Sequence, residues 1–115
     1  MKEFILLNRV PAAYGAAEAN AVREKWNLVT DKWKADNVFV SSFIFPGTGQ
    51  VISGNERSVR KDMVLSNDLR MVSTIVIRAA DIDAAVALSK SCPILEQGGM
   101  VEVNEIQPGP ASPQP

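Results

Sequence analysis

MVSTIVIRAADIDAAVALSKSCPILEQGGMVEVNEI occupies residues 71–106. It begins with Met71–Ile77, which is rich in Val, Ile and Thr, and these branched side chains favour a strand. Asp81 opens an alanine-rich segment, and its carboxylate can accept hydrogen bonds from the free amides of a first helical turn. Pro93 cannot continue that helix and restricts the preceding cysteine, so the helix should end at or just before it. After a glycine pair, Met100–Ile106 predicts a second strand.

The part of the chain before this stretch begins with a predicted strand and a long helix. Lys2–Arg9 carries apolar residues on both of its faces, so we expect an interior strand. From Ala16 to about Lys34 the apolar residues recur with the period of a helix. They are Val22, Trp26, Val29 and Trp33. The pattern predicts an amphipathic helix that lies on a sheet.

The next part of the chain predicts another strand and an irregular hairpin. Val38–Phe45 is again apolar on both faces. Strict alternation would place Phe39, Phe43 and Phe45 on one face, and Val38, Val40 and Ile44 on the other. Val51-Ile52 is expected to be a short strand, Gly54-Asn55 a turn, and Ser58–Leu65 a second arm. Residues 66–68 predict one more turn.

The predicted order is strand, helix, strand, hairpin, strand, helix, strand. Two split strand-helix-strand units that share one largely antiparallel sheet, with both helices on one face, form a ferredoxin-like α+β sandwich. The opposite face would then be apolar and bare, and such patches usually mark interfaces. A symmetric homodimer that packs sheet on sheet would cover it. The domain should span residues 1–107, and the proline-rich residues 108–115 should form a mobile tail.

Composition limits the classes of function. The chain has 115 residues, of which 46% are hydrophobic and 22% charged, as expected for one globular domain. Its formal charge is −1 and no basic block occurs, so we expect neither nucleic acid nor a membrane as partner. A single cysteine and the lack of a signal-type or membrane-spanning segment predict a cytoplasmic protein. No metal site or cofactor is predicted, because histidine is absent and Gly47 and Gly49 lack the strand-to-helix setting of a dinucleotide loop.

Four segments carry a resemblance to a known family. They are MKEFILL at residues 1–7, the helix with Lys25-Trp26 and Lys32-Trp33, ADIDAA at residues 80–85, and SCPILEQGGMVEV at residues 91–103. Together they resemble the YCII-related family, also called DGPF-domain proteins, over residues 1–107. The resemblance implies a dimeric α+β barrel, in agreement with the symmetric dimer expected above. It implies no particular reaction, since most members have none assigned.

The chain departs from this family at its signature and in its chemistry. The Asp-Gly-Pro-Phe signature should fall near residues 61–65, where only Asp62 could stand for the first residue and the tight Gly-Pro turn is lost. Some relatives are thought to use a His-Asp pair as acid and base, but this chain has no histidine. Catalysis of that type is therefore not predicted. Without a histidine to activate it, Cys92 is interpreted as a buried packing residue.

The candidate ligand-binding residues are Arg9, Trp26, Ser42, Asp62 and Arg70. Arg9 would either hold an anionic ligand between sheet and helix or form a solvated ion pair at the edge of the sheet. Trp26 would either line a pocket or belong to the core with Trp33. Asp62 and Arg70 would form a polar pair at the mouth of the pocket or be ordinary surface charges.

Two classes of function stay open. The first is a non-catalytic dimeric module that binds a small organic molecule or a protein partner in the cleft between sheet and helices. The second is an enzyme, a lyase, isomerase or dehalogenase that acts on a small lactone or muconate-like acid through carboxylates and Arg9. The missing histidine and the lost signature turn favour the first class. A buried carboxylate that faces an arginine in a closed apolar cleft would favour the second.

Overall fold

The computed structural model describes residues 1–110, and residues 111–115 of the predicted tail lie outside the described residues. The elements in chain order are β1 (Lys2–Val10), α1 (Ala16–Ala35), β2 (Phe39–Ile44), β3 (Gln50–Ser53), β4 (Ser58–Lys61), β5 (Leu65–Ser66), β6 (Leu69–Ala79), α2 (Ile82–Ser89), the 3-10 helix η1 (Pro93–Gln97) and β7 (Met100–Ile106). The predicted strands and helices are present close to their expected bounds. Helix η1 was not predicted.

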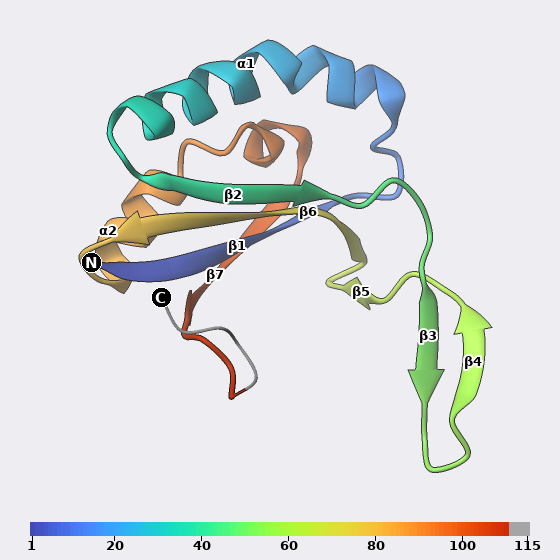
Figure 1. Cartoon of the computed structure of the whole chain (residues 1–115). Coiled ribbons are helices and arrows are strands. Elements are labelled where there is room, and N and C mark those ends of the chain that lie inside the picture. Colours follow the sequence, from blue (N-terminus) through green and yellow to red (C-terminus); the bar gives the residue numbers. More distant parts are fainter. Residues whose placement is uncertain (111–115) are drawn as a thin grey trace.

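The main sheet is antiparallel, with its long strands in the order β2-β6-β1-β7 and the short β5 paired to β6. β1 is therefore an interior strand, as predicted. Helices α1 and α2 cover one face of this sheet, and the core lies between the two layers (Figure 1). This is the arrangement of a ferredoxin-like α+β fold, and it confirms the fold class predicted from the sequence.

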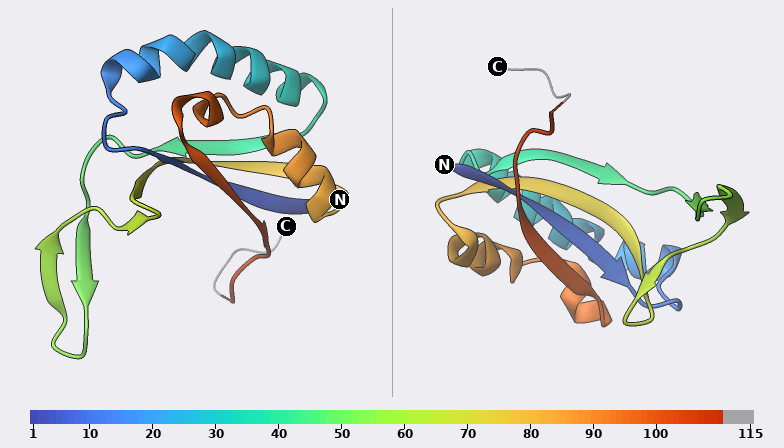
Figure 2. Two further views of the ribbon diagram at one scale, coloured as in Figure 1. Left: turned by 180° about the vertical axis from the view of Figure 1, so that it is seen from behind. Right: turned by 90° about the horizontal axis from the view of Figure 1, so that it is seen from below.

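Strand β1 separates the two sides of the sheet. Its residues Phe4, Leu6, Asn8 and Val10 are fully buried on the side of the helices. They lie in or beside a core that also contains Trp33, Ile75, Ile77, Ala79, Ala85, Cys92 and Ile94. The alternating residues Glu3, Ile5, Leu7 and Arg9 face the other side, which we call the open face. No helix covers the open face in the part of the chain that the structure describes (Figure 2).

Both helices meet the sheet as the sequence predicted. In α1, Val22 and Trp33 are buried, while Trp26 and Val29 are partly buried against the core. Because all four fall on one helical stripe, their burial sets the rotation of α1 on the sheet. Helix α2 begins at Asp81, whose Oδ1 accepts a hydrogen bond of 2.8 Å from a backbone amide of the first turn. This satisfies an amide that has no partner within the helix.

A β-bulge in β2 changes the faces that its aromatic side chains occupy. Phe39 pairs with Ile77 of the core, but the register shifts before Ser41, and Phe43 pairs with Thr74. Residues directly opposite in an antiparallel pair share a face, so Phe39 packs on the core while Phe43 lies on the open face, 62% exposed. The prediction that these two phenylalanines share a face is wrong, because one extra residue inverts the alternation.

The glycine pair after η1 returns the chain to the sheet. Gly98 has a φ of 76°, in the left-handed region that favours glycine. A Cβ on Gly99 would lie 2.7 Å from the carbonyl oxygens of both Arg9 and Ile94. At Gly99 the backbone therefore packs against β1 and η1 more closely than any residue with a Cβ would allow. The turn predicted at this glycine pair is confirmed.

Strands β3 and β4 form a separate hairpin, which we call the arm, and it projects from the body of the domain (Figures 1 and 2). The hairpin was predicted, but its second strand ends at Lys61 rather than at Leu65. Its paired residues Ile52 and Val59 are 69% and 59% exposed. The radius of gyration is 15.6 Å, whereas a compact chain of this length would have about 13 Å. The arm thus presents apolar side chains that its own domain does not cover.

Candidate functional site

The structure divides the five candidate residues between two separate cavities. Trp26 and Ser42 line a cavity between α1 and the sheet, which we call the Trp26 cleft. Arg9, Asp62 and Arg70 line a cavity at the root of the arm, which we call the Arg9 pocket. The sequence had placed all five in one cleft between sheet and helices. The alternation of β1 makes that impossible for Arg9, because its neighbour Asn8 is the residue that faces the helices.

The Trp26 cleft has a volume of about 470 Å³, within the range of small-molecule sites. Helix α1 supplies Trp26 and Arg23, which come one turn apart on the face turned toward the sheet edge. Strand β2 supplies Ser42 opposite them, and β6 supplies Ser73 and Ile75 on the floor. An aromatic wall, an aliphatic floor and the hydroxyl groups of Ser42 and Ser73 therefore meet in one cavity.

A buried polar pair lies behind this cleft. Asn8 is fully buried, and its Nδ2 donates a hydrogen bond of 3.1 Å to the Oγ of Ser73. Within residues 1–110, the Oδ1 of Asn8 has no hydrogen-bond partner. Because leaving a buried amide oxygen without a partner costs about 1 to 3 kcal/mol, the Asn8–Ser73 pair is a costly feature of an otherwise apolar core.

Tyr14 adds a phenol to the rim of the Trp26 cleft. Burial raises the pKa of this phenol above its ordinary value, and the nearby charge of Arg70 opposes the shift in part. The hydroxyl group therefore stays protonated at neutral pH and can act as a hydrogen-bond donor.

The Arg9 pocket has a volume of about 290 Å³ and lies at the root of the arm. The side chain of Arg9 is 13% exposed, and its Nη2 lies 3.8 Å from the Oε1 of Glu102. That separation is an ion pair but is too long for a hydrogen bond. Among the described residues, the Nε of Arg9 is buried and has no hydrogen-bond partner. Arg9 therefore does not lie between sheet and helix. It forms an ion pair, as the second alternative predicted, but on an interior strand and with its own side chain mostly removed from water.

Asp62 and Arg70 line the same pocket but bind other groups. Asp62 accepts a 2.8 Å hydrogen bond from the Nε of Arg60 and another of 2.8 Å from the amide of Met63. These two bonds, that of Arg60 first, lower the pKa of the exposed Asp62 carboxyl below its ordinary value. Arg70 donates from Nη2 to the backbone oxygen of Tyr14 at 2.8 Å. The polar pair of Asp62 with Arg70, one of the two alternatives that the sequence left open, is not formed, because each residue is held by another partner.

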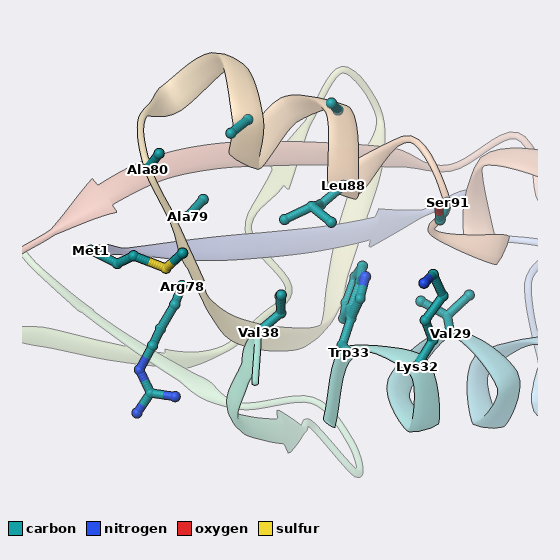
Figure 3. A pocket seen from close by; sticks show the side chains of 12 residues that line it. Met1, Val29, Lys32, Trp33, Val38, Arg78, Ala79, Ala80, Leu88 and Ser91 are labelled. Atoms are coloured by element: carbon teal, nitrogen blue, oxygen red, sulfur yellow. The ribbon is translucent and has the colours of Figure 1, made fainter. Parts of the chain in front are cut away.

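A third cavity, of about 540 Å³, lies between the two helices (Figure 3). Trp33 and Lys32 of α1 lie on one side of it, opposite Leu88 and Ser91, and Arg78 points away (Figure 3). The Nζ of Lys32 is held by a carboxylate of the same helix at 2.9 Å. Alanine and other apolar side chains make up most of the remaining wall. A ligand site needs a few polar groups that are aimed into it and free to bind. Here Arg78 points away and Lys32 is already bound to a carboxylate, so we do not favour this groove.

The chemistry of the other candidate groups is limited. Cys92 is 2% exposed, and burial raises the pKa of its thiol to about 12. A thiol with that pKa is not a nucleophile near neutral pH, which confirms its interpretation as a packing residue. Within the described part of the chain, no three His, Cys, Asp or Glu side chains come together in a way that could hold a metal ion. Among residues 1–110, no helix is long and apolar enough to cross a membrane.

Among the polar residues, sequence reasoning missed Tyr14, Arg23 and Ser73 of the Trp26 cleft and Asn8 behind it. Tyr14 and Ser73 line the cleft, and Asn8 is bonded to Ser73. A signal was present for Asn8, since it is a polar residue on the face of a strand that is otherwise apolar. No comparable signal marks Tyr14, because it belongs to a turn whose position depends on the packing of α1.

Comparison with known proteins adds no further constraint. No model of a protein family matches the chain, and no curated protein matches it either.

Proposed function

We propose that this chain is a YCII-like dimeric protein that binds a small organic molecule in the Trp26 cleft, without catalysis of the His-Asp type. The observation that carries the proposal is the convergence of Trp26, Ser42 and Ser73 from three separate elements on one cavity of about 470 Å³. A mostly apolar cavity with a few placed polar groups is the usual form of a ligand site. The resemblance over residues 1–107 and the ferredoxin-like fold agree with membership of the YCII-related family.

The lining favours a ligand with a flat apolar part and at least one hydrogen-bonding group. Trp26 offers a ring face for stacking, and Ile75 offers an aliphatic surface below it. The hydroxyls of Ser42 and Ser73 can each donate or accept a hydrogen bond.

The alternative of a lyase, isomerase or dehalogenase has less support. It required a buried carboxylate facing an arginine, and Asp62 is instead an exposed carboxylate held by Arg60. Its lowered pKa keeps it ionised at neutral pH, so it has no proton to give as a general acid. The binding function is therefore the one that we propose.

The dimer in this proposal places the open face of the sheet against a second copy. The open face carries Ile5 and Leu7 in the middle of the sheet and the exposed Phe43 at its edge. The arm carries Ile52 and Val59, and a two-stranded hairpin is only marginally stable by itself in water. A second copy related by a two-fold axis would cover both surfaces at once. The expected location is the cytoplasm, where a single thiol stays reduced.

A ligand screen followed by fluorescence tests the binding function. Small lactones and carboxylic acids are screened by thermal shift. Hits are then titrated into a Trp33→Phe variant, which retains Trp26 as its single tryptophan. A cleft ligand should change the emission of Trp26, and Ser42→Val should weaken binding by about tenfold, the equivalent of one lost hydrogen bond. Leu28→Ala is the control, because Leu28 is 72% exposed on α1 outside the cleft. Hits that leave Trp26 emission unchanged, or that bind Ser42→Val equally well, would refute the proposal.

A further inference from the structure

The Arg9 pocket contains a buried cation whose donors are not fully used. Arg9 is 13% exposed, its Nε has no hydrogen-bond partner within residues 1–110, and its closest carboxylate, that of Glu102, is 3.8 Å away. A guanidinium removed from water needs acceptors for its N–H groups, since each unmatched donor carries a desolvation cost. The carboxylate of Glu102 balances part of the positive charge of Arg9. It leaves the N–H group at the Nε of Arg9 without a hydrogen-bond acceptor.

The charges around the pocket leave room for one more negative group. Arg9 and Arg70 line the pocket, and Arg60 is bound to the carboxylate of Asp62 at its edge. Three guanidinium groups therefore meet two carboxylates, those of Asp62 and Glu102, so one positive charge is in excess. The carboxylate of Asp62 already accepts two hydrogen bonds. It would therefore be a poor partner for Arg9 even if the Arg9 side chain changed its conformation.

The rest of the pocket is lined by apolar side chains and glycines, and its volume is small. Phe45, Met63, Val64 and Met71 surround the arginines, and Gly47 and Gly49 of the loop after β2 complete the lining. The volume of about 290 Å³ is at the lower end of the range for ligand sites. A planar carboxylate matches the fork of a guanidinium with two parallel hydrogen bonds, and an apolar body would fill the space between the aromatic and thioether side chains.

We propose that the Arg9 pocket is a second ligand site, separate from the Trp26 cleft, and that it takes a small apolar monocarboxylate. The carboxylate binds the guanidinium of Arg9. Arg70, on the neighbouring strand β6, contributes a second positive charge. The apolar body of the ligand packs between Phe45 and Met63. This site lies at the root of the arm. It does not depend on the function proposed for the Trp26 cleft.

Benzoate is the probe, and benzamide is its neutral counterpart of the same shape. Both are titrated by calorimetry at constant ionic strength into the full chain and into Arg9→Met, a variant that keeps length and loses charge. Benzoate should bind at least about tenfold more tightly than benzamide, and Arg9→Met should remove that difference. Arg57→Met is the matched control, because Arg57 is an exposed arginine in the turn of the arm, outside the pocket.

Two further variants distinguish benzoate bound at Arg9 from benzoate bound elsewhere on the chain. Trp26→Leu should leave benzoate affinity unchanged, so loss of binding in this variant would place benzoate in the Trp26 cleft and overturn the second site. If Arg9→Met does not fold by circular dichroism, Val64→Glu replaces it, because Val64 is 65% exposed and lines the pocket. The added negative charge should weaken benzoate and not benzamide. Equal binding of the two probes, or no benzoate binding to the full chain at millimolar concentration, would also overturn the proposal.

Discussion

At the residue scale, neighbours on one strand have opposite roles. Asn8 is fully buried under the helices and bonded to Ser73, while Arg9 lies on the open face beside Glu102. Their order along β1 determines which cavity each can reach, because successive side chains of a strand point to opposite faces. Arg9 thus lines the Arg9 pocket, whereas Asn8 lies behind the Trp26 cleft without lining it.

Trp33 is the residue whose truncation should cost the most stability in α1. It is 3% exposed and belongs to the central core, whereas Trp26 is only partly buried at the edge of a cleft. Trp33→Ala should lower the free energy of unfolding by about 3 to 5 kcal/mol, through lost transfer energy and the cavity left behind. Chemical denaturation measures it, with the exposed Leu28→Ala as control. A loss below about 1 kcal/mol would mean that the side chain is not part of the core.

Cys92 predicts a pH dependence. Its thiol has a pKa of about 12 in the folded state, against an ordinary value of 9.0, because burial disfavours the thiolate. In the unfolded chain the thiol loses its proton at lower pH than in the folded chain. Folding stability is therefore fully present below pH 9.0 and falls as pH rises from there toward 12.

The comparison that isolates this effect is Cys92→Ala, measured by denaturation at several pH values between 7 and about 10.5. Wild type should lose more stability over this range than the variant does. A parallel loss in both proteins would assign the pH dependence to other groups. Thiol reagents should also label the native chain far more slowly than the denatured one, since Cys92 is buried.

At the scale of elements, the short helix α2 depends on its cap more than α1 does. α2 runs only from Ile82 to Ser89, while α1 runs from Ala16 to Ala35 and carries its own long apolar stripe. A single lost capping bond is a larger share of the stability of a short helix, because few hydrogen bonds within it can compensate. The residue that supplies this bond is Asp81.

Asp81→Ala should therefore destabilise the domain by about 1 kcal/mol, since a backbone amide of the first turn loses its acceptor. Asp81→Asn keeps a side-chain oxygen and should lose less than half of that amount. Thermal and chemical denaturation of the two variants give the comparison. If Asn and Ala destabilise equally, the negative charge near the helix start matters rather than the hydrogen bond.

At the scale of the whole molecule, we expect the open face and the arm to form the interface of the proposed dimer. The exposed Phe43 lies on the open face, and the exposed Ile52 lies on the arm. Apolar side chains on two separate surfaces of one chain can both be covered by one symmetric partner, which would also support the projecting hairpin. The dimer is thus the simplest arrangement that covers these surfaces.

Light scattering at micromolar concentration should give twice the monomer mass. Phe43→Glu and Ile52→Glu should each shift the protein toward monomer, because a charge would be buried at the interface. Both side chains are exposed in the single chain, so the fold of the monomer should tolerate the change. Leu28→Glu, on the outer side of α1, should leave the dimer intact. A wild-type protein of monomer mass would contradict the dimer and leave the apolar arm without a covering surface.

The sequence by itself determined the elements and their order. The helical stripe of α1, the cap at Asp81 and the glycine pair at residues 98–99 act through contacts between near neighbours in the chain, and each appears in the structure where it was predicted. It also determined the fold class, because two split strand-helix-strand units allow few arrangements around one sheet.

Only the tertiary structure decided where the polar residues lie. The bulge in β2 placed Phe39 and Phe43 on opposite faces, and the pairing of β1 with β6 and β7 placed Arg9 beside Glu102. The five candidate residues were therefore divided between two cavities. These outcomes depend on the register between strands distant in sequence, where a shift of one residue reverses every side chain, and no local pattern encodes that register.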